Sequence, residues 1–392
     1  MVAVAFSSFI RRYKMQDISL YIHIPFCASK CHYCDFSSFS GIEDRIPLYV
    51  NSLIAEIDLY RQKLENYNVK TIFIGGGTPS HIEAKYIYRI LGHIYENYNA
   101  QNVKEITIEV NPGTVNKEKS RIYKELGINR VSMGAQSFND SLLRKIGRIH
   151  NAKDIFSSYK ILSQIGIENI NLDLIFGLPE QTLNDVLKST KMAVELGAHH
   201  ISHYGLIIEE GTKFYEYHKN GRLYLPDEDL EREMYHRATE YLVGQGYKHY
   251  EISNYSLKGY ECKHNIVYWD IEPYIGLGLS SHSFMEGRRF FNTSDFSSYI
   301  DLLKDNILPV DGEEIVDVNG ELEDYCIFGL RKIDGIDKEK FYSRFGINIE
   351  ELYGEALTKH IKGGLLVDCG QFIKLTKKGL DLSNLVEIDF IK

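Results

Sequence analysis

Short apolar runs alternate with longer amphipathic segments along roughly the first half of the chain. The predicted strands are 18–24, 71–74, 105–110, 130–134, 168–175 and 200–204, and the predicted helices are 47–64, 83–98, a stretch ending near Leu126, and 183–196. Strands that alternate with helices at this spacing form βαβ units and a parallel sheet. The fold class is therefore α/β, with six units that make either an open doubly wound sheet or an incomplete (βα)6 barrel. In both architectures the functional residues lie at the C-terminal ends of the strands.

The regular alternation ends near Pro226. Residues 227–244 are typical of a charged helix, and a Tyr- and Gly-rich stretch, expected to be irregular, follows through Met285. Helical segments return from Glu321, and two short strands around Gly370 precede a last helix, which resembles the wing of a winged-helix domain. The sequence thus predicts an N-terminal extension at 1–17, a core domain at 18–225, a barrel-flanking segment at 226–305 and a smaller α+β domain at 306–392.

Composition narrows the class of protein. A hydrophobic fraction of 44% and a charged fraction of 25% are typical of a globular protein. The net charge of -9 argues against a nucleic-acid binder, which needs a basic surface. No apolar run is long enough to cross a bilayer, and Arg11, Arg12 and Lys14 follow the apolar start, whereas a secretory signal has its charges first. We therefore expect a cytoplasmic protein without a nucleic-acid partner.

Three of the six cysteines, Cys27, Cys31 and Cys34, lie within eight residues directly after the first predicted strand. A disulfide-stabilised domain would be shorter and denser in cysteine. Thiolates at this spacing are suited to an iron–sulfur cluster, and three ligands on a four-iron cluster would leave one iron open to a small molecule. Zinc is the alternative, although it prefers two pairs of ligands and would need a fourth ligand such as His23 or His32.

The residues around these cysteines, YIHIPFCASKCHYC, resemble the CxxxCxxC signature of the radical S-adenosylmethionine (SAM) superfamily. The opening Y-I-H-I-P-F-C is similar to that of the oxygen-independent coproporphyrinogen III oxidase-like branch. The resemblance implies a partial (βα)6 TIM-like barrel with a smaller, winged-helix-like α+β domain. It also implies that Cys27, Cys31 and Cys34 hold a [4Fe-4S] cluster whose open iron binds the amino and carboxylate groups of SAM. An electron donor such as flavodoxin or ferredoxin is a further implied partner.

Further motifs at the strand ends match SAM contacts of that branch. Each residue alone would more readily be assigned to a turn, to the core or to a solvated surface, because a single Gly triplet or strand-end acid is weak evidence. Their common order and their place at strand ends favour the SAM site that the resemblance implies. These residues are Gly76, Gly77 and Thr78 of GGGTP, Glu109 of IEVNP, Gln136 of GAQSF, Arg148 of IGRIHN and Asp173 of NLDLIFGLP, with Tyr21 and Gly205 as weaker matches.

Two departures distinguish the chain from the oxidases of this branch, which carry CxxxCxxCxC and a long N-terminal segment. Phe36 occupies the position of the extra cysteine, and the segment before the signature is short. These features, with the HNIVYW sequence at 264–269, resemble the HemW group of heme chaperones. The resemblance implies one heme per chain, passed to an acceptor protein such as a respiratory complex. The alternative is a coproporphyrinogen oxidase of porphyrin biosynthesis, or another radical SAM enzyme, which would share every SAM contact.

His264 is the candidate heme ligand, because a neutral imidazole is a good axial ligand and nearby aromatic side chains can sandwich the macrocycle. The alternative is a buried His–Asn pair that satisfies backbone groups of a loop, with Tyr268 and Trp269 in the core. His282 of SSHSF is a second candidate, and the lack of CxxCH argues against c-type heme attachment. A nucleic-acid role for the wing-like C-terminus would need a basic stripe, which the sequence does not display.

Overall fold

A sheet of twelve strands forms the centre of the molecule in the computed structural model, which describes residues 15–391. Six of its strands, β1 to β6, lie side by side, parallel and in sequence order. They are β1 (Gln16–Ile24), β2 (Tyr67–Gly76), β3 (Glu105–Val110), β4 (Arg130–Gln136), β5 (Asn169–Phe176) and β6 (His200–Gly205). All six predicted strands are confirmed. The first begins inside the predicted 1–17 extension, of which residues 1–14 lie outside the described part of the chain.

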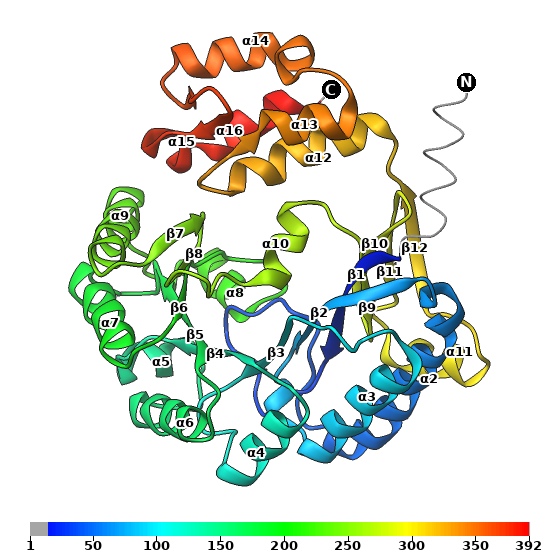
Figure 1. Cartoon of the computed structure of the whole chain (residues 1–392). Coiled ribbons are helices and arrows are strands. Elements are labelled where there is room, and N and C mark those ends of the chain that lie inside the picture. The colour runs from blue at the N-terminus through cyan, green and yellow to red at the C-terminus, as the bar shows by residue number, and fades with distance from the viewer. Residues whose placement is uncertain (1–14, 392) are drawn as a thin grey trace, which may run out of the picture.

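Helices cover the outer face of the parallel strands, and the sheet curves around its inner face (Figure 1). The connecting helices are α2 (Ile46–Leu64), α3 (Ala84–Asn97), α4 (Lys117–Glu125), α5 (Asp140–Lys145), α6 (Ala152–Gln164) and α7 (Leu183–Glu195). Strand and helix side chains together form the largest apolar core. The sequence predicts no helix between 134 and 168, yet α6 begins there with a capping box of Asn151 and Asp154, which satisfies free backbone N–H groups.

Further strands extend the parallel sheet at both edges. β9 (Tyr274–Leu277) pairs in parallel with β1, and β10 (His282–Met285), β11 (Arg288–Asn292) and β12 (Val310–Ile315) continue from it antiparallel. At the other edge β8 (Asn254–Ser256) and β7 (Lys248–Glu251) continue antiparallel from β6. The outermost strands, β12 and β7, are not paired with each other in the described chain, so the barrel is open. Of the two architectures that periodicity allowed, the structure has the incomplete barrel.

The structure differs from the sequence expectation in the second half of the chain. The stretch through Met285 was expected to be irregular, but it contains β7, β8, α10 (Lys263–Trp269), β9 and β10. Strands of three or four residues show no clear period, which is why they escape detection. β12 pairs with β11 and so belongs to the large sheet, whereas the predicted boundary at 306 assigns it to the C-terminal domain.

The C-terminal domain has its own apolar core, around residues that include Phe341, Leu357 and Phe390. Its elements are α12 (Val318–Arg331), β13 (Ile336–Asp337), α13 (Lys338–Phe345), α14 (Ile349–Lys362), β14 (Leu366–Asp368), β15 (Phe372–Leu375), α15 (Lys377–Asp381) and α16 (Ser383–Glu387). The order helix, strand, two helices and a two-stranded hairpin is that of a winged-helix domain. Three further helices pack on the barrel: α8 (Lys213–Lys219), α9 (Glu228–Gly244) and α11 (Phe296–Lys304). No helix in 15–391 is long and apolar enough to span a membrane.

Helix α10, which carries the HNIVYW sequence, covers the N-terminal end of the barrel. The Glu105 carboxylate at the start of β3 accepts hydrogen bonds from the backbone N–H groups of Lys263 and His264, each at 3.0 Å. These are N–H groups of the first helical turn, which have no partner within the helix. A buried acid therefore fixes α10 beneath the parallel strands.

The C-terminal domain contacts the end of the same helix. The Arg331 guanidinium lies over the Trp269 ring at 4.6 Å, and the Arg344 side chain donates to the backbone carbonyls of Asp270 and Ile271, each at 3.2 Å. A salt bridge of 2.5 Å joins Lys332 to Asp270. Thus α10 and the residues after it connect the barrel to the C-terminal domain.

Glu56 of α2 connects the segment 278–299 to this helix through three hydrogen bonds. Its carboxylate accepts hydrogen bonds from the Gly278 N–H at 2.8 Å, from Asn292 Nδ2 at 2.6 Å and from the Tyr299 hydroxyl at 2.6 Å. The side chain is fully buried, and burial raises its pKa to about 7 although the three hydrogen bonds oppose the shift.

We expect Glu56 to make stability fall as pH rises from 4.5 to about 7. Below this window Glu56 is protonated in the folded and the unfolded chain, but within it only the unfolded chain releases the proton. Glu56→Gln cannot ionise, so its free energy of unfolding relative to wild type should increase by roughly 3 kcal/mol across the window. Urea denaturation at both ends of the window measures this, with the exposed Glu65→Gln as control. A relative stability that is independent of pH would contradict the role of Glu56.

Candidate functional site

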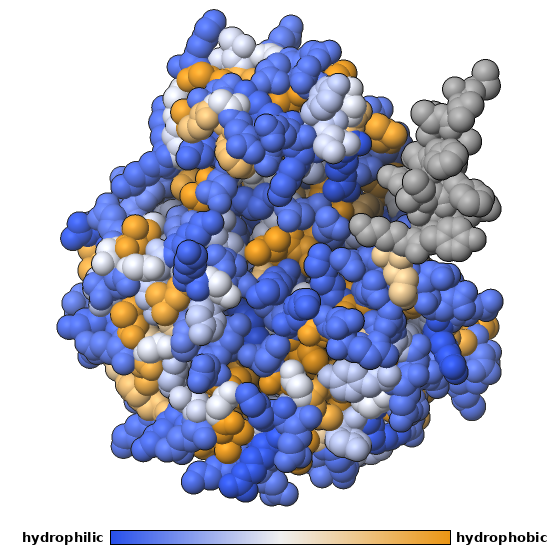
Figure 2. Space-filling view, viewed as in Figure 1, coloured by the Kyte–Doolittle hydropathy of each residue, from blue (hydrophilic) through white to orange (hydrophobic). Residues whose placement is uncertain are grey.

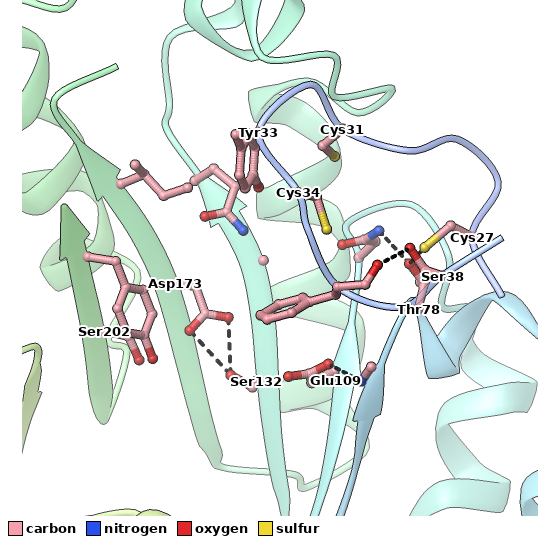
Figure 3. A pocket seen from close by; sticks show the side chains of 18 of the residues that line it. Cys27, Cys31, Tyr33, Cys34, Ser38, Thr78, Glu109, Ser132, Asp173 and Ser202 are labelled. Carbon is pink, nitrogen blue, oxygen red and sulfur yellow. Dashed lines mark hydrogen bonds between the residues drawn. The ribbon is translucent and has the colours of Figure 1, made fainter. Parts of the chain in front are cut away.

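A cavity of about 560 Å³ lies at the C-terminal ends of the parallel strands and extends into the barrel. The loop that follows β1 contributes Cys27, Cys31 and Cys34 to its lining. Figure 3 shows the three thiols along this loop, with Glu109 and Asp173 facing the same space from the strands. The cysteines and the carboxylates, far apart in the sequence, therefore share one site.

Backbone hydrogen bonds hold the cysteine loop in place. The Cys27 N–H donates to the Phe39 carbonyl at 2.8 Å, and the Phe39 N–H donates to the Pro25 carbonyl at 2.7 Å. In the middle of the loop the His32 N–H donates to the Ile146 carbonyl at 3.0 Å. Because both ends and the middle are tied to the barrel, the three thiols have fixed positions relative to the strands.

The glycines at the end of β2 allow this loop to pack directly on the strand. A Cβ atom on Gly77 would lie 2.9 Å from the Phe26 carbonyl oxygen and 3.1 Å from Cys27 Sγ. Gly76 has φ +112, and a Cβ there would lie 2.6 Å from the His23 ring. Glycine is thus required at position 77 for the close approach, and at position 76 for both the close approach and the positive φ.

The arrangement of the thiols fits a multi-iron cluster better than a single ion. In residues 15–391 no three His, Cys, Asp or Glu side chains converge as one tetrahedral zinc ion requires. A [4Fe-4S] cluster binds each thiolate on a different iron, so three separated thiols around one cavity suit it. Burial raises the pKa of Cys34 to about 11 and also raises that of Cys27, so both thiols lose protons when they bind metal.

Two half-buried carboxylates, Glu109 and Asp173, give the cavity an affinity for positive charge. Burial, followed by the nearby charge of Asp173, raises the pKa of Glu109 to about 8. Burial also raises the pKa of Asp173, although hydrogen bonds from Asn171 and Ser202 oppose this. The Gly76 N–H donates to Glu109 Oε2 at 3.0 Å, and the structure gives Oε1 no hydrogen-bond partner within the described chain. SAM carries an ammonium and a sulfonium group, which such carboxylates can stabilise.

Arg148 connects the cysteine loop to the end of β4. Its guanidinium donates to Asn111 Oδ1 at 2.9 Å, to Cys31 Sγ at 3.5 Å and to the Gly134 carbonyl. The Asn111 side chain in turn donates to Thr78 Oγ1 at 2.9 Å. A cation next to a cluster ligand stabilises the thiolate and offers a place for a ligand carboxylate.

Sequence comparisons agree with this geometry. The Radical SAM superfamily model matches residues 21–193, and the HemN C-terminal domain model matches residues 321–382. The heme chaperone HemW of Lactococcus lactis is 38% identical over 95% of this chain and 97% of its own. HemW of Bacillus subtilis is 38% identical over 93% and 97%, and HemW of Escherichia coli is 33% identical over 96% and 98%. The chain belongs to the HemW family of radical SAM proteins.

The fold has a match among solved structures as well. The coproporphyrinogen III oxidase HemN of Escherichia coli, described as a radical SAM enzyme, superposes with a TM-score of 0.85 over 99% of this chain and 93% of its own. Its sequence identity is 21%, so this likeness concerns the fold. The partial barrel and the small C-terminal domain of this HemW family member are therefore shared with the oxidase.

Most predicted SAM contacts line the cavity, and three predicted residues do not. Those in the lining are Gly76, Gly77, Thr78, Glu109, Gln136, Arg148, Asp173 and Gly205. Tyr21 lies outside it, with its hydroxyl hydrogen-bonded to His23 Nδ1 at 3.0 Å. His264 is buried beneath the barrel, and His282 is exposed on β10. The assignment of residues to SAM and heme stays a prediction.

Apart from Gln136 and Asp173, the polar residues on the inner faces of β4, β5 and β6 were missing from the prediction. They alternate with apolar residues along β4, β5 and β6, and this period of two was visible in the sequence. They carry a network in which Ser132 donates to Asp173 Oδ2 at 3.1 Å and Asn171 donates to Asp173 Oδ1 at 2.7 Å. The cavity residues found only in the structure include Tyr33, Ser38, Asn111, Arg130, Ser132, Asn171, Ser202, Tyr204 and Asn265.

We expect Gly77→Ala to lower cluster content severalfold, because its Cβ would push against Phe26 and Cys27. The overlap should also destabilise the fold by about 1–3 kcal/mol. Iron and sulfide per chain after anaerobic reconstitution measure the first effect, and denaturant unfolding measures the second. Gly92→Ala, in α3 with nothing within 4 Å of the new Cβ, should keep full cluster content. Normal iron content in Gly77→Ala would refute the requirement for close approach.

Proposed function

We propose that this protein is a heme chaperone that binds heme and passes it to an acceptor protein, while Cys27, Cys31 and Cys34 hold a [4Fe-4S] cluster with SAM beside it. The observation that carries the proposal is similarity over nearly the whole chain to relatives named heme chaperone HemW. The match to the Lactococcus lactis relative covers 95% of this chain and 97% of the relative.

In this proposal Cys27, Cys31 and Cys34 would hold the [4Fe-4S] cluster, and the cavity beside them would take SAM. Glu109 and Asp173 offset the positive charges of SAM, and Arg148 holds the loop and faces the SAM carboxylate. When bound, the cluster supplies one electron to SAM, which a flavodoxin or ferredoxin delivers. No disulfide joins any of the cysteines in residues 15–391, which suits a reducing compartment such as the cytoplasm.

Phe36 argues against coproporphyrinogen oxidation. It lines the mouth of the cavity with 62% of its surface exposed, at the position where the oxidases of this branch carry a further cysteine. A phenyl ring can neither bind metal nor exchange protons or electrons with a substrate. An exposed apolar ring at a cavity mouth is better suited to contact an apolar ligand.

The hydrogen bonds around His264 favour the tautomer with its proton on Nδ1, which heme ligation through Nε2 needs. The Thr71 hydroxyl donates its proton to Ser19 Oγ at 2.8 Å, so the His264 Nδ1, 2.7 Å from Thr71 Oγ1, carries the shared proton. Nε2 then has a free electron pair, which accepts from the Tyr268 hydroxyl at 2.8 Å. A metal-ligating histidine commonly donates its other N–H in this way. We propose that Nε2 of His264 would ligate heme iron once the Tyr268 side chain moves aside, because the ring is buried as it stands.

The first experiment compares heme binding with oxidase activity in the reconstituted full chain. We expect heme titration, followed by the Soret band, to saturate at one heme per chain. With coproporphyrinogen III, SAM and a reductant under strict anaerobiosis, no protoporphyrinogen should form. Formation of protoporphyrinogen without stoichiometric heme binding would instead establish an oxidase.

The second experiment tests the iron ligand with two variants. We expect His264→Ala to shift the Soret band and weaken heme binding, since the axial nitrogen is lost. Tyr268→Phe removes the competing hydroxyl while keeping the ring, so its heme affinity should equal or exceed that of wild type. If His264 serves only the packing of α10, both variants will lower the melting temperature and leave the Soret position unchanged, which contradicts the ligand assignment.

A further inference from the structure

Arg130 is a buried cation without a hydrogen-bond partner. It stands at the start of β4 with 2% of its surface exposed, and it lines the cavity. Its side chain makes no hydrogen bond and no ion pair with any residue in 15–391, and its Nε is fully enclosed. A guanidinium has five N–H donors, and leaving donors of a buried charge unpaired is costly. This cost indicates that an acceptor from outside the chain completes the site.

The neighbouring acids are engaged elsewhere. Glu105 accepts from the N–H groups of Lys263 and His264, and Asp173 accepts from Ser132 and Asn171. Their charges act on Arg130 from a distance and offset its own. The remaining polar groups are also paired with one another: Asn171 Oδ1 accepts from His200 Nδ1 at 2.7 Å and from Ser202 Oγ at 3.2 Å. Among these neighbours, Arg130 is therefore the one whose side chain forms no hydrogen bond within the described chain.

Arg130 marks the floor of the cavity, opposite the cysteine loop. Arg130 and Gly134 lie four residues apart on β4, which at about 3.3 Å per residue separates them by about 13 Å. Gly134 lies at the same height in the barrel as Arg148 and the cysteine loop, because its backbone carbonyl accepts a hydrogen bond from Arg148. At the floor Arg130 is accompanied by Asn265 of α10, so the HNIVYW sequence contributes a polar side chain to the cavity.

We propose that Arg130, with Asn265 beside it, binds a carboxylate group of an organic ligand that enters the barrel. The planar guanidinium matches a carboxylate with two parallel hydrogen bonds. A singly charged carboxylate suits the site better than a phosphate dianion, because the charges of Glu105 and Asp173 already act on Arg130 and would repel the dianion more strongly. This inference rests on the proposed function for the identity of the ligand, which is heme, held through a propionate.

The test measures binding of heme and of heme dimethyl ester, in which both propionates are esterified, to the full chain carrying cluster and SAM. We expect Arg130→Met to weaken heme binding roughly 10- to 100-fold, as loss of a charge-assisted contact does. Its affinity for the ester should match that of wild type. Asn265→Asp, which adds a carboxylate beside Arg130, should weaken heme binding in the same selective way while leaving Arg130 in place.

Arg144→Gln is the matched control, because it removes the same charge from an exposed site on α5 outside the cavity. Melting temperature and SAM affinity of each variant report whether the fold is kept. The carboxylate site is overturned if both Arg130→Met and Asn265→Asp lose heme and ester affinity equally, or if both variants keep the two affinities of wild type. In either case the proposed function stands. If wild type binds neither porphyrin, the proposed function fails. Binding of the dicarboxylate glutarate, measured by saturation-transfer NMR, then tests the carboxylate site. A glutarate signal with wild type that is lost in Arg130→Met supports the site, and a signal that is unchanged in the variant or absent from wild type overturns it.

Discussion

The close approach of the cysteine loop to the end of β2 is the constraint on which the site depends. Gly77 leaves no room for a side chain between the strand and the backbone of Phe26 and Cys27. The loop therefore lies on the strand end instead of extending into solvent, and Cys27 Sγ comes within 3.4 Å of the Thr78 hydroxyl. Arg148 and Asn111 complete the junction from the next strands. Positions of three thiols on a loop are thus set by the rigid sheet beneath them.

The interior of the barrel shows how a polar cavity is kept in a stable fold. The outer faces of the strands supply the apolar core, whereas the inner faces supply a hydrogen-bonded network around Asp173, Asn171 and His200. A network in which each member has a partner is rigid and costs little to bury. Against this background the unpaired guanidinium of Arg130 and the high pKa of Glu109 mark the places where a ligand completes the structure.

The HNIVYW helix has a structural role that any ligand role must accommodate. Glu105 holds its first turn, Thr71 holds the His264 ring, and the C-terminal domain packs on its end through Arg331 and Trp269. Asn265 of this helix thus lines the cavity, and Trp269 contacts the C-terminal domain. Figure 2 shows hydrophobic surface near the centre of the view, between the barrel and the C-terminal domain, within a mostly hydrophilic exterior. A substitution at His264 would consequently disturb the packing of the helix against both domains.

The sequence by itself determined the six parallel strands, the cysteine signature and its family, because period, spacing and motif are local properties of the chain. It also indicated most residues around the cavity, since strand ends in a parallel sheet meet at one edge. The family resemblance also predicted the partial barrel, and only the tertiary structure decided that β12 joins the large sheet and that α10 covers the barrel. It alone brought Arg130, Asn265 and Asp173 to one cavity, and it enclosed His264 between Thr71 and Tyr268. These features depend on pairing and packing between segments that are not adjacent in the sequence, such as Thr71 and His264, and no local pattern encodes such contacts.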